Sequence, residues 1–119
     1  ETIAQYYMED MRHRKKEALK LLLLNMKTKL IGESELSLGT INTTLVSPRE
    51  VFAEALRRNA AAVILLHNHP SGDPTPSRED VLATRRVIDA GKIIGIELLD
   101  HIIIGDNCFI SLRDKGFFK

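Results

Sequence analysis

Two histidines and one aspartate stand at a spacing that can hold a metal ion. His67 and His69 are two positions apart, and Asp80 follows eleven positions after His69. In an extended chain residues two apart point to the same side, so both imidazoles can face one ion. Two neutral nitrogens and a carboxylate oxygen suit zinc, with the fourth tetrahedral position open for water. Zinc in an open site polarises a carbonyl and lowers the pKa of water, which predicts a zinc-dependent hydrolase.

Each of these residues also has a simpler interpretation. Two close histidines beside a proline-rich loop can be ordinary loop residues. Ser77 and Asp80 together form a helix capping-box pattern, in which neither residue needs a metal. The spacing of the whole set therefore favours a metal site more than any single residue does.

The elements that must position this set follow from the hydrophobic pattern. The apolar run 60–66 predicts a central strand covered on both faces, which ends at His67. Residues 70–76 hold three prolines and Gly72 and predict a loop. Ser77 then opens a helix that is expected to stop at Gly91. Both histidines are thus placed at the carboxyl end of a strand, with Asp80 in the first turn of the next helix.

The rest of the chain alternates helical and extended patterns. Residues 3–14 are weakly helical, 18–26 predict a buried strand, and 30–44 predict one or two more strands. Ser47 with Pro48 and Glu50 predicts a capped helix to about Asn59, with Val51, Phe52, Ala55 and Leu56 on its apolar face. In the helix that Ser77 opens, Val81, Leu82, Val87 and Ile88 are expected to form the apolar face. Residues 93–99 and 101–104 read as strands, and a turn at 105–107 leads into 108–112. This order predicts an α/β or α+β fold with a mixed sheet.

Composition narrows the classes of protein that fit. The 119 residues suffice for one domain, with 44% hydrophobic and 28% charged residues. The 17 basic and 16 acidic residues leave a charge of +1, without the basic excess of a dedicated nucleic-acid binder. The basic run 12–16 is interpreted as a solvated surface turn, or alternatively as a contact for an anionic partner.

The predicted location is the cytoplasm. No apolar run reaches the roughly 18 residues that a membrane-spanning helix needs, and the first residues do not resemble a signal peptide. Cys108 is the only cysteine, which fits a reducing compartment. It is expected to be a buried, inert thiol in a strand.

The motif also resembles that of a known family. His67-x-His69-x(10)-Asp80, with Ser77 three residues before the aspartate, resembles the JAMM motif of MPN-type metalloproteases. The run 67–77 closely resembles the RadC family of bacterial JAMM-like proteins, with further matches at 59–61, 90–91 and 99–105. The resemblance covers about residues 16–118.

This resemblance implies a fold and a domain organisation. The implied fold is an MPN/JAMM-like mixed sheet flanked by helices, with cytidine-deaminase-like layering. Residues 1–119 would form a single domain, with 1–15 as a helical lead-in. RadC-like proteins commonly carry a helix-hairpin-helix-like region before this domain, so the chain resembles the C-terminal domain of a longer protein.

The resemblance further implies roles for individual residues. An upstream glutamate should act as the general base on water, and Glu17 stands at the matching place, with Glu33 and Glu35 as rivals. Ser77 would stabilise the oxyanion. His101 is interpreted as a structural histidine, or alternatively as a residue that supports the metal ligands.

The expected function is therefore a zinc metallopeptidase or isopeptidase that acts on a peptide or protein. RadC-like proteins are traditionally labelled as DNA repair proteins, so a DNA-associated accessory module is one alternative. A partner-binding domain with purely structural zinc is another. The near-neutral charge and the lack of aromatic stacking runs argue against direct DNA binding.

Overall fold

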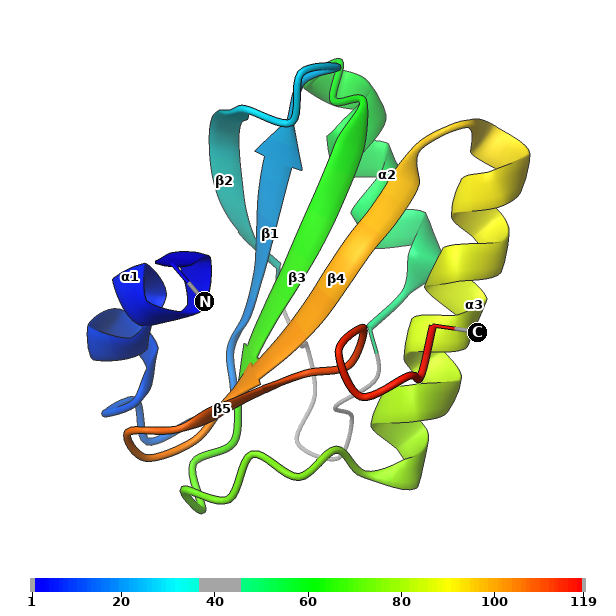
Figure 1. Cartoon of the computed structure of the whole chain (residues 1–119). Coiled ribbons are helices and arrows are strands. Elements are labelled where there is room, and N and C mark those ends of the chain that lie inside the picture. Colours follow the sequence, from blue (N-terminus) through cyan, green and yellow to red (C-terminus); the bar gives the residue numbers. More distant parts are fainter. Residues whose placement is uncertain (1, 37–45, 119) are drawn as a thin grey trace.

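The computed structural model describes residues 2–36 and 46–118 (Figure 1). Their elements in chain order are α1 (Thr2–Met11), β1 (Leu19–Leu24), β2 (Leu30–Leu36), α2 (Pro48–Arg57), β3 (Ala62–Asn68), α3 (Arg78–Ile94), β4 (Glu97–Ile104) and β5 (Phe109–Ser111). Any second strand predicted within 30–44 lies outside the described residues.

The described strands form one mixed sheet in the order β2-β1-β3-β4-β5. β1 pairs antiparallel with both β2 and β3, and β4 pairs antiparallel with β5. β3 and β4 are parallel, because α3 carries the chain back across the sheet between them. The predicted α+β fold with a mixed sheet flanked by helices is confirmed.

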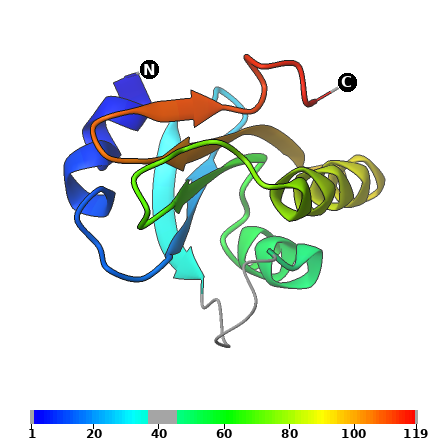
Figure 2. The same ribbon diagram turned by 90° about the horizontal axis from the view of Figure 1, so that it is seen from below.

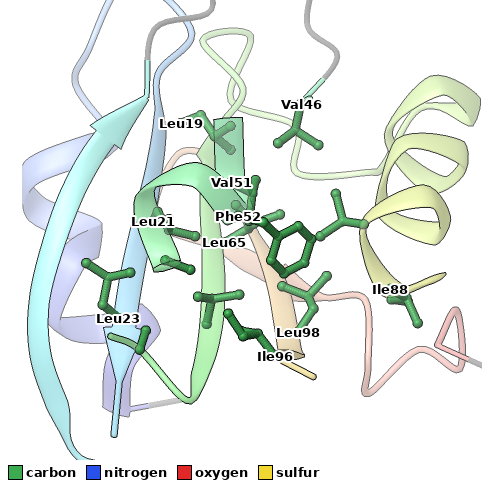
Figure 3. Packing of buried hydrophobic residues seen from close by; sticks show 14 of the residues in the cluster. Leu19, Leu21, Leu23, Val46, Val51, Phe52, Leu65, Ile88, Ile96 and Leu98 are labelled. Carbon is green, nitrogen blue, oxygen red and sulfur yellow. The ribbon is translucent and has the colours of Figure 1, made fainter. Parts of the chain in front are cut away.

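Helices cover both faces of the sheet. Seen from below, α2 and α3 lie on one side of the strands and α1 on the other (Figure 2). Leu19, Leu21 and Leu23 pack toward α2 and α3, whereas Leu22 and Leu24 pack toward α1. Figure 3 shows the first of these two cores, with Phe52 of α2 packed among the strand residues. Burial on both faces explains why β1 and β3 are continuous apolar runs rather than alternating ones.

The end of α3 differs from the prediction. The helix continues past Gly91 to Ile94 and ends at Gly95, whose φ of 92° is left-handed. Gly91 serves close packing instead, because a Cβ there would lie 2.3 Å from the carbonyl oxygen of Ile96. The predicted strand 93–99 was therefore wrong in its first half, and β4 begins at Glu97.

The start of α2 also differs in part. Pro48 occupies the first turn as predicted, and Ser47 is the N-cap residue, but the Ser47 side chain makes no capping hydrogen bond. The predicted capping box with Glu50 was thus wrong, and the packing of Val51, Phe52 and Ala55 anchors the helix instead. Two leucines assigned to apolar helix faces, Leu56 and Leu82, are exposed.

Cys108 is exposed, so the expected buried thiol was wrong. The amide of Gly105 donates to the carbonyl oxygen of Cys108 at 2.8 Å, which places Cys108 in the turn before β5. Within the described ranges, no helix has the length and hydropathy needed to cross a bilayer.

The basic run 12–16 is partly neutralised within the chain. Arg12 pairs with Glu9 and lies 3.6 Å from Asp106, and Arg14 pairs with Asp10 and with Glu35. These contacts favour the interpretation of the run as a surface turn.

Candidate metal centre

The register of β1 against β3 brings Glu17 to the histidines. The last paired residues of this antiparallel ladder are Leu19 and His67. Two residues further along, Glu17 lies beside His69, on the same face of the sheet as Leu19 and His67. Fifty residues of sequence therefore separate groups that strand pairing makes neighbours.

The first turn of α3 brings Asp80 to the same place. The backbone amide of Ser77 donates to Asp80 Oδ2 at 2.9 Å, and the amide of Asp80 donates to Ser77 Oγ at 3.0 Å. This is the predicted capping box, and it is confirmed. Asp80 is only 3% exposed, so the cap also fixes a carboxylate inside the site. The capping role and a metal-binding role are therefore compatible.

The proline-rich loop between His69 and Ser77 is fastened to the turn between β4 and β5. The amide of Asp106 donates to the carbonyl oxygen of Gly72 at 2.9 Å. Gly72 has a φ of 93°, which favours glycine. A Cβ on Gly105 would lie 2.3 Å from Gly72 O, so this close approach requires glycine at position 105. The loop thus returns the chain to the strand end in a defined conformation.

Four polar side chains meet as a result. His67 Nε2 lies 3.1 Å from Glu17 Oε2, and His69 Nε2 lies 4.0 Å from the same oxygen. On the other side, His69 Nε2 lies 3.2 Å from Asp80 Oδ2, and His67 Nδ1 lies 3.7 Å from Asp80 Oδ1. The structure therefore brings Glu17, His67, His69 and Asp80 together.

The donor set fits a metal ion. Ligand atoms about 2.1 Å from a tetrahedral zinc lie about 3.4 Å from one another, close to the separations observed here. One ligand atom from each of Glu17, His67 and His69 lies within 4.8 Å of the others. Asp80 contacts both imidazoles from the opposite side. Among the described residues, the compact ligand group thus contains Glu17, whereas Asp80 faces Nδ1 of His67 and Nε2 of His69 from outside that group.

Hydrogen bonds orient the His69 ring and raise its pKa. The bond to Asp80 is the main cause that raises the pKa of His69, and burial partly opposes it. Its Nδ1 lies 3.0 Å from the carbonyl oxygen of Asp73 and donates to it. Because Nδ1 makes this second bond, Nε2, which faces Asp80 and Glu17, is the nitrogen that would bind a metal, an arrangement common around metal-binding histidines.

Asp80 is held as a carboxylate. Burial alone would raise its pKa, but hydrogen bonds from His69 and from the backbone of Ser77 outweigh burial and hold the pKa well below its usual range. An ionised, buried oxygen next to two imidazoles is a ready ligand for a divalent cation, which would take the place of protons.

His101 packs behind His67. The two ring centroids are 5.8 Å apart, and His101 is 2% exposed. Burial, aided by the nearby His67, lowers the pKa of His101 to about 3, so the ring is neutral. Its Nδ1 lies 2.6 Å from Thr84 Oγ1, whereas Nε2 has no partner within the described part of the chain.

The rival glutamates do not reach this centre. Glu33 and Glu35 lie on β2, where Glu35 pairs with Arg14 and Glu33 lies 3.8 Å from Lys20 Nζ. Of the three glutamates considered, only Glu17 contacts the histidines.

Sequence reasoning missed two buried polar residues, Asn68 and Thr84, each 1% exposed. Asn68 lies between the histidines and holds the backbone on both sides of Glu17. The available signal was its position, since a polar residue at the end of a buried strand must find hydrogen-bond partners. Thr84 gave no such signal, because threonine is common on helix surfaces.

The described residues thus form a candidate metal site at a strand end and a capped helix start, on a mixed sheet flanked by helices. Residues 1–117 match the family described as RadC-like JAB domain, and the chain belongs to this family. Similar proteins include a UPF0758 protein of Caldanaerobacter subterraneus subsp. tengcongensis, 52% identical over 118 residues. Another is a UPF0758 protein of Bacillus cereus strain B4264, 56% identical over 116 residues.

These alignments cover 99% and 98% of the present chain, but only 51% and 52% of the two relatives. A UPF0758 protein of Desulforamulus reducens is 55% identical over 116 residues, with 98% and 51% coverage. The chain thus spans about half the length of these relatives.

Proposed function

We propose that this chain is a zinc-dependent metallohydrolase that cleaves a peptide or isopeptide bond. The observation that carries the proposal is the grouping of Glu17 with His67 and His69, with Asp80 in contact with both histidines, although Glu17 is fifty residues from His67 in the sequence. Membership of the RadC-like JAB family supports the same class of chemistry.

Under this proposal His67, His69 and Asp80 hold the ion. Zinc bound there would supply a Lewis acid for a carbonyl oxygen and would favour the ionisation of water. The choice of zinc rests on the donor set, since two imidazole nitrogens and one carboxylate oxygen are typical of its open sites.

Glu17 is the proposed general base. Its carboxylate is about a quarter exposed and lies within 3.1 Å of His67 Nε2, so it borders both the ligand group and solvent. It would take a proton from the attacking water and deliver it to the leaving amine.

Ser77 is the proposed oxyanion donor. Its Oγ accepts a hydrogen bond from the Asp80 amide, and no acceptor within residues 2–36 and 46–118 takes its own hydrogen, which would bond a substrate oxygen. The proposed substrate is a peptide or a protein, and the proposal specifies neither its sequence nor a partner domain. Direct DNA binding is not expected from a chain of charge +1.

Metal analysis tests the proposal. Protein purified without chelator should carry about one zinc per chain, and His67→Ala should remove it. A chain that carries no metal and takes up none would overturn the proposal. In a gel-shift assay, tight DNA binding with a steep salt dependence would instead favour the DNA-associated alternative.

A further inference from the structure

Glu17 lies just beyond the end of the β1–β3 ladder. The last pair in this ladder is Leu19 and His67, so regular strand pairing does not reach Glu17. A side chain attached to unpaired backbone would sample several directions, yet Glu17 Oε2 is 3.1 Å from His67 Nε2. Another interaction must therefore hold this backbone.

The carboxamide of Asn68 supplies it. The amide of Ala18 donates to Asn68 Oδ1 at 2.6 Å, and Asn68 Nδ2 donates to the carbonyl oxygen of Lys16 at 3.2 Å. The Asn68 backbone amide adds a longer bond of 3.4 Å to the Ala18 carbonyl oxygen. The Asn68 side chain thus hydrogen-bonds the backbone of the residues on both sides of Glu17, beyond the end of the ladder.

We propose that Asn68 is the positioning residue of Glu17, which it aims at the metal centre by holding the backbone of Lys16 and Ala18. This inference rests on the proposed function for the role of Glu17 as a base, whereas the hydrogen bonds of Asn68 to Lys16 and Ala18 do not depend on that function. Asparagine suits this task because it carries a donor and an acceptor on one short, planar group. Aspartate keeps the acceptor for Ala18 but loses the donor for Lys16, and alanine loses both.

A purely stabilising role is the competing explanation, and Asn25 offers a matched control. Asn25 stands at the opposite end of β1, where its Oδ1 accepts from the amides of Lys27 and Lys29 at 2.9 and 3.0 Å. Asn25→Ala therefore removes a comparable pair of side chain to backbone bonds, far from the metal centre.

The experiment compares Asn68→Ala, Asn68→Asp and Asn25→Ala, with zinc affinity, kcat and KM for peptide hydrolysis as readouts. Displacing a catalytic group by about 1 Å lowers turnover about 100-fold, so kcat should fall about 10- to 100-fold in both Asn68 variants. Zinc affinity and KM should stay within about threefold, because the ligands remain in place. Asn25→Ala should keep its kcat, and an equal loss in this control would overturn the proposal.

A double-mutant cycle isolates the path through Glu17. In a Glu17→Gln background, Asn68→Asp should lower kcat no further, since the residue that it positions has already lost its function. A full, additive loss in that background would overturn the proposal. If Asn68→Ala fails to fold, Asn68→Asp retains one of the two bonds and carries the test.

A crystal structure of metal-free Asn68→Asp separates this inference from the proposed function. Wild-type protein that binds no zinc and hydrolyses no peptide would refute the function alone. The structure would still decide the positioning role: a displaced Glu17 carboxylate supports it, and an unchanged contact with His67 overturns it.

Discussion

The Thr84 hydroxyl bridges α3 and β4 by donating to the carbonyl oxygen of Asp80 at 2.7 Å while it lies 2.6 Å from Nδ1 of His101. A hydroxyl has a single hydrogen, so Nδ1 of His101 must carry the hydrogen of the second bond. The tautomer of His101 is thereby fixed, and its ring is held against His67. This bridge connects the backbone of one proposed ligand to the ring behind another.

Removing the bridge should weaken metal binding. Thr84→Val keeps the shape of the side chain but leaves His101 Nδ1 without its buried acceptor. Residues that orient metal ligands contribute about 10- to 100-fold to affinity, so zinc affinity should fall by about tenfold. Competition with a chromophoric chelator measures it, with Thr28→Val, an exposed threonine in the turn between β1 and β2, as the control. Unchanged affinity in Thr84→Val would show that the bridge serves folding alone.

The two carboxylates of the centre should respond differently to neutralisation. If Asp80 is the ligand and Glu17 the base, Asp80→Asn loses zinc, whereas Glu17→Gln keeps it and loses hydrolysis by about 100-fold or more. Metal content and kcat, measured on the same preparations, distinguish the two roles. If Glu17→Gln loses zinc and Asp80→Asn keeps it, Glu17 is the ligand and Asp80 is not.

The two serine N-caps should differ in their effect on stability. Ser77 accepts a hydrogen bond from the Asp80 amide, whereas the Ser47 side chain makes no capping bond. Ser77→Ala should therefore lower the free energy of unfolding by about 1 kcal/mol, and Ser47→Ala by much less. Urea denaturation of the metal-free proteins measures both. Equal losses would contradict the capping assignment.

Acid should loosen α1 from the sheet. The hydrogen bond from Lys20 lowers the pKa of Asp10 despite partial burial, and Arg14 adds to the effect. A carboxyl with a depressed folded-state pKa stabilises the fold above its unfolded pKa, and this stabilisation is lost as the pH falls through the folded pKa. Hydrogen exchange in α1 should therefore accelerate below about pH 4 relative to the core strands. In Asp10→Asn the acid-dependent part of this acceleration should disappear, and its persistence would assign the effect to another group.

Gly105 should not tolerate a side chain. Gly105→Ala would place Cβ 2.3 Å from the carbonyl oxygen of Gly72, against backbone that cannot yield without moving the loop 70–76. We expect a loss of zinc affinity together with a lowered melting temperature. Gly95→Ala is the control, because a Cβ there meets no atom within 4 Å and only the positive φ is unfavourable. A larger loss of zinc affinity in the control would refute the role of the close approach.

Local patterns predicted the parts of the site that lie close together in the sequence. The apolar run before His67 and His69 predicted a buried strand, and Ser77 with Asp80 predicted a helix start, because each signal depends on residues a few positions apart. Glu17 was assigned from family resemblance alone. Its proximity to His67 depends on the register of β1 against β3, which no local rule predicts.

Each error has its own structural cause. Gly91 looked like a helix stop, but its absent side chain serves the approach of Ile96, a contact made only in the folded chain. Cys108 was assigned to a strand because the turn between β4 and β5 extends one residue further than expected. Asn68 was overlooked because its partners, Lys16 and Ala18, belong to another strand segment.

The capping box of α3 bears on the order in which the centre is assembled. His67, His69 and Asp80 come from one short stretch of chain, joined by a strand end, a fastened loop and a helix start. Glu17 joins them only when β1 has paired with β3. Under the proposed function, a chain in which β1 has not yet paired with β3 would hold its three ligand residues without the base.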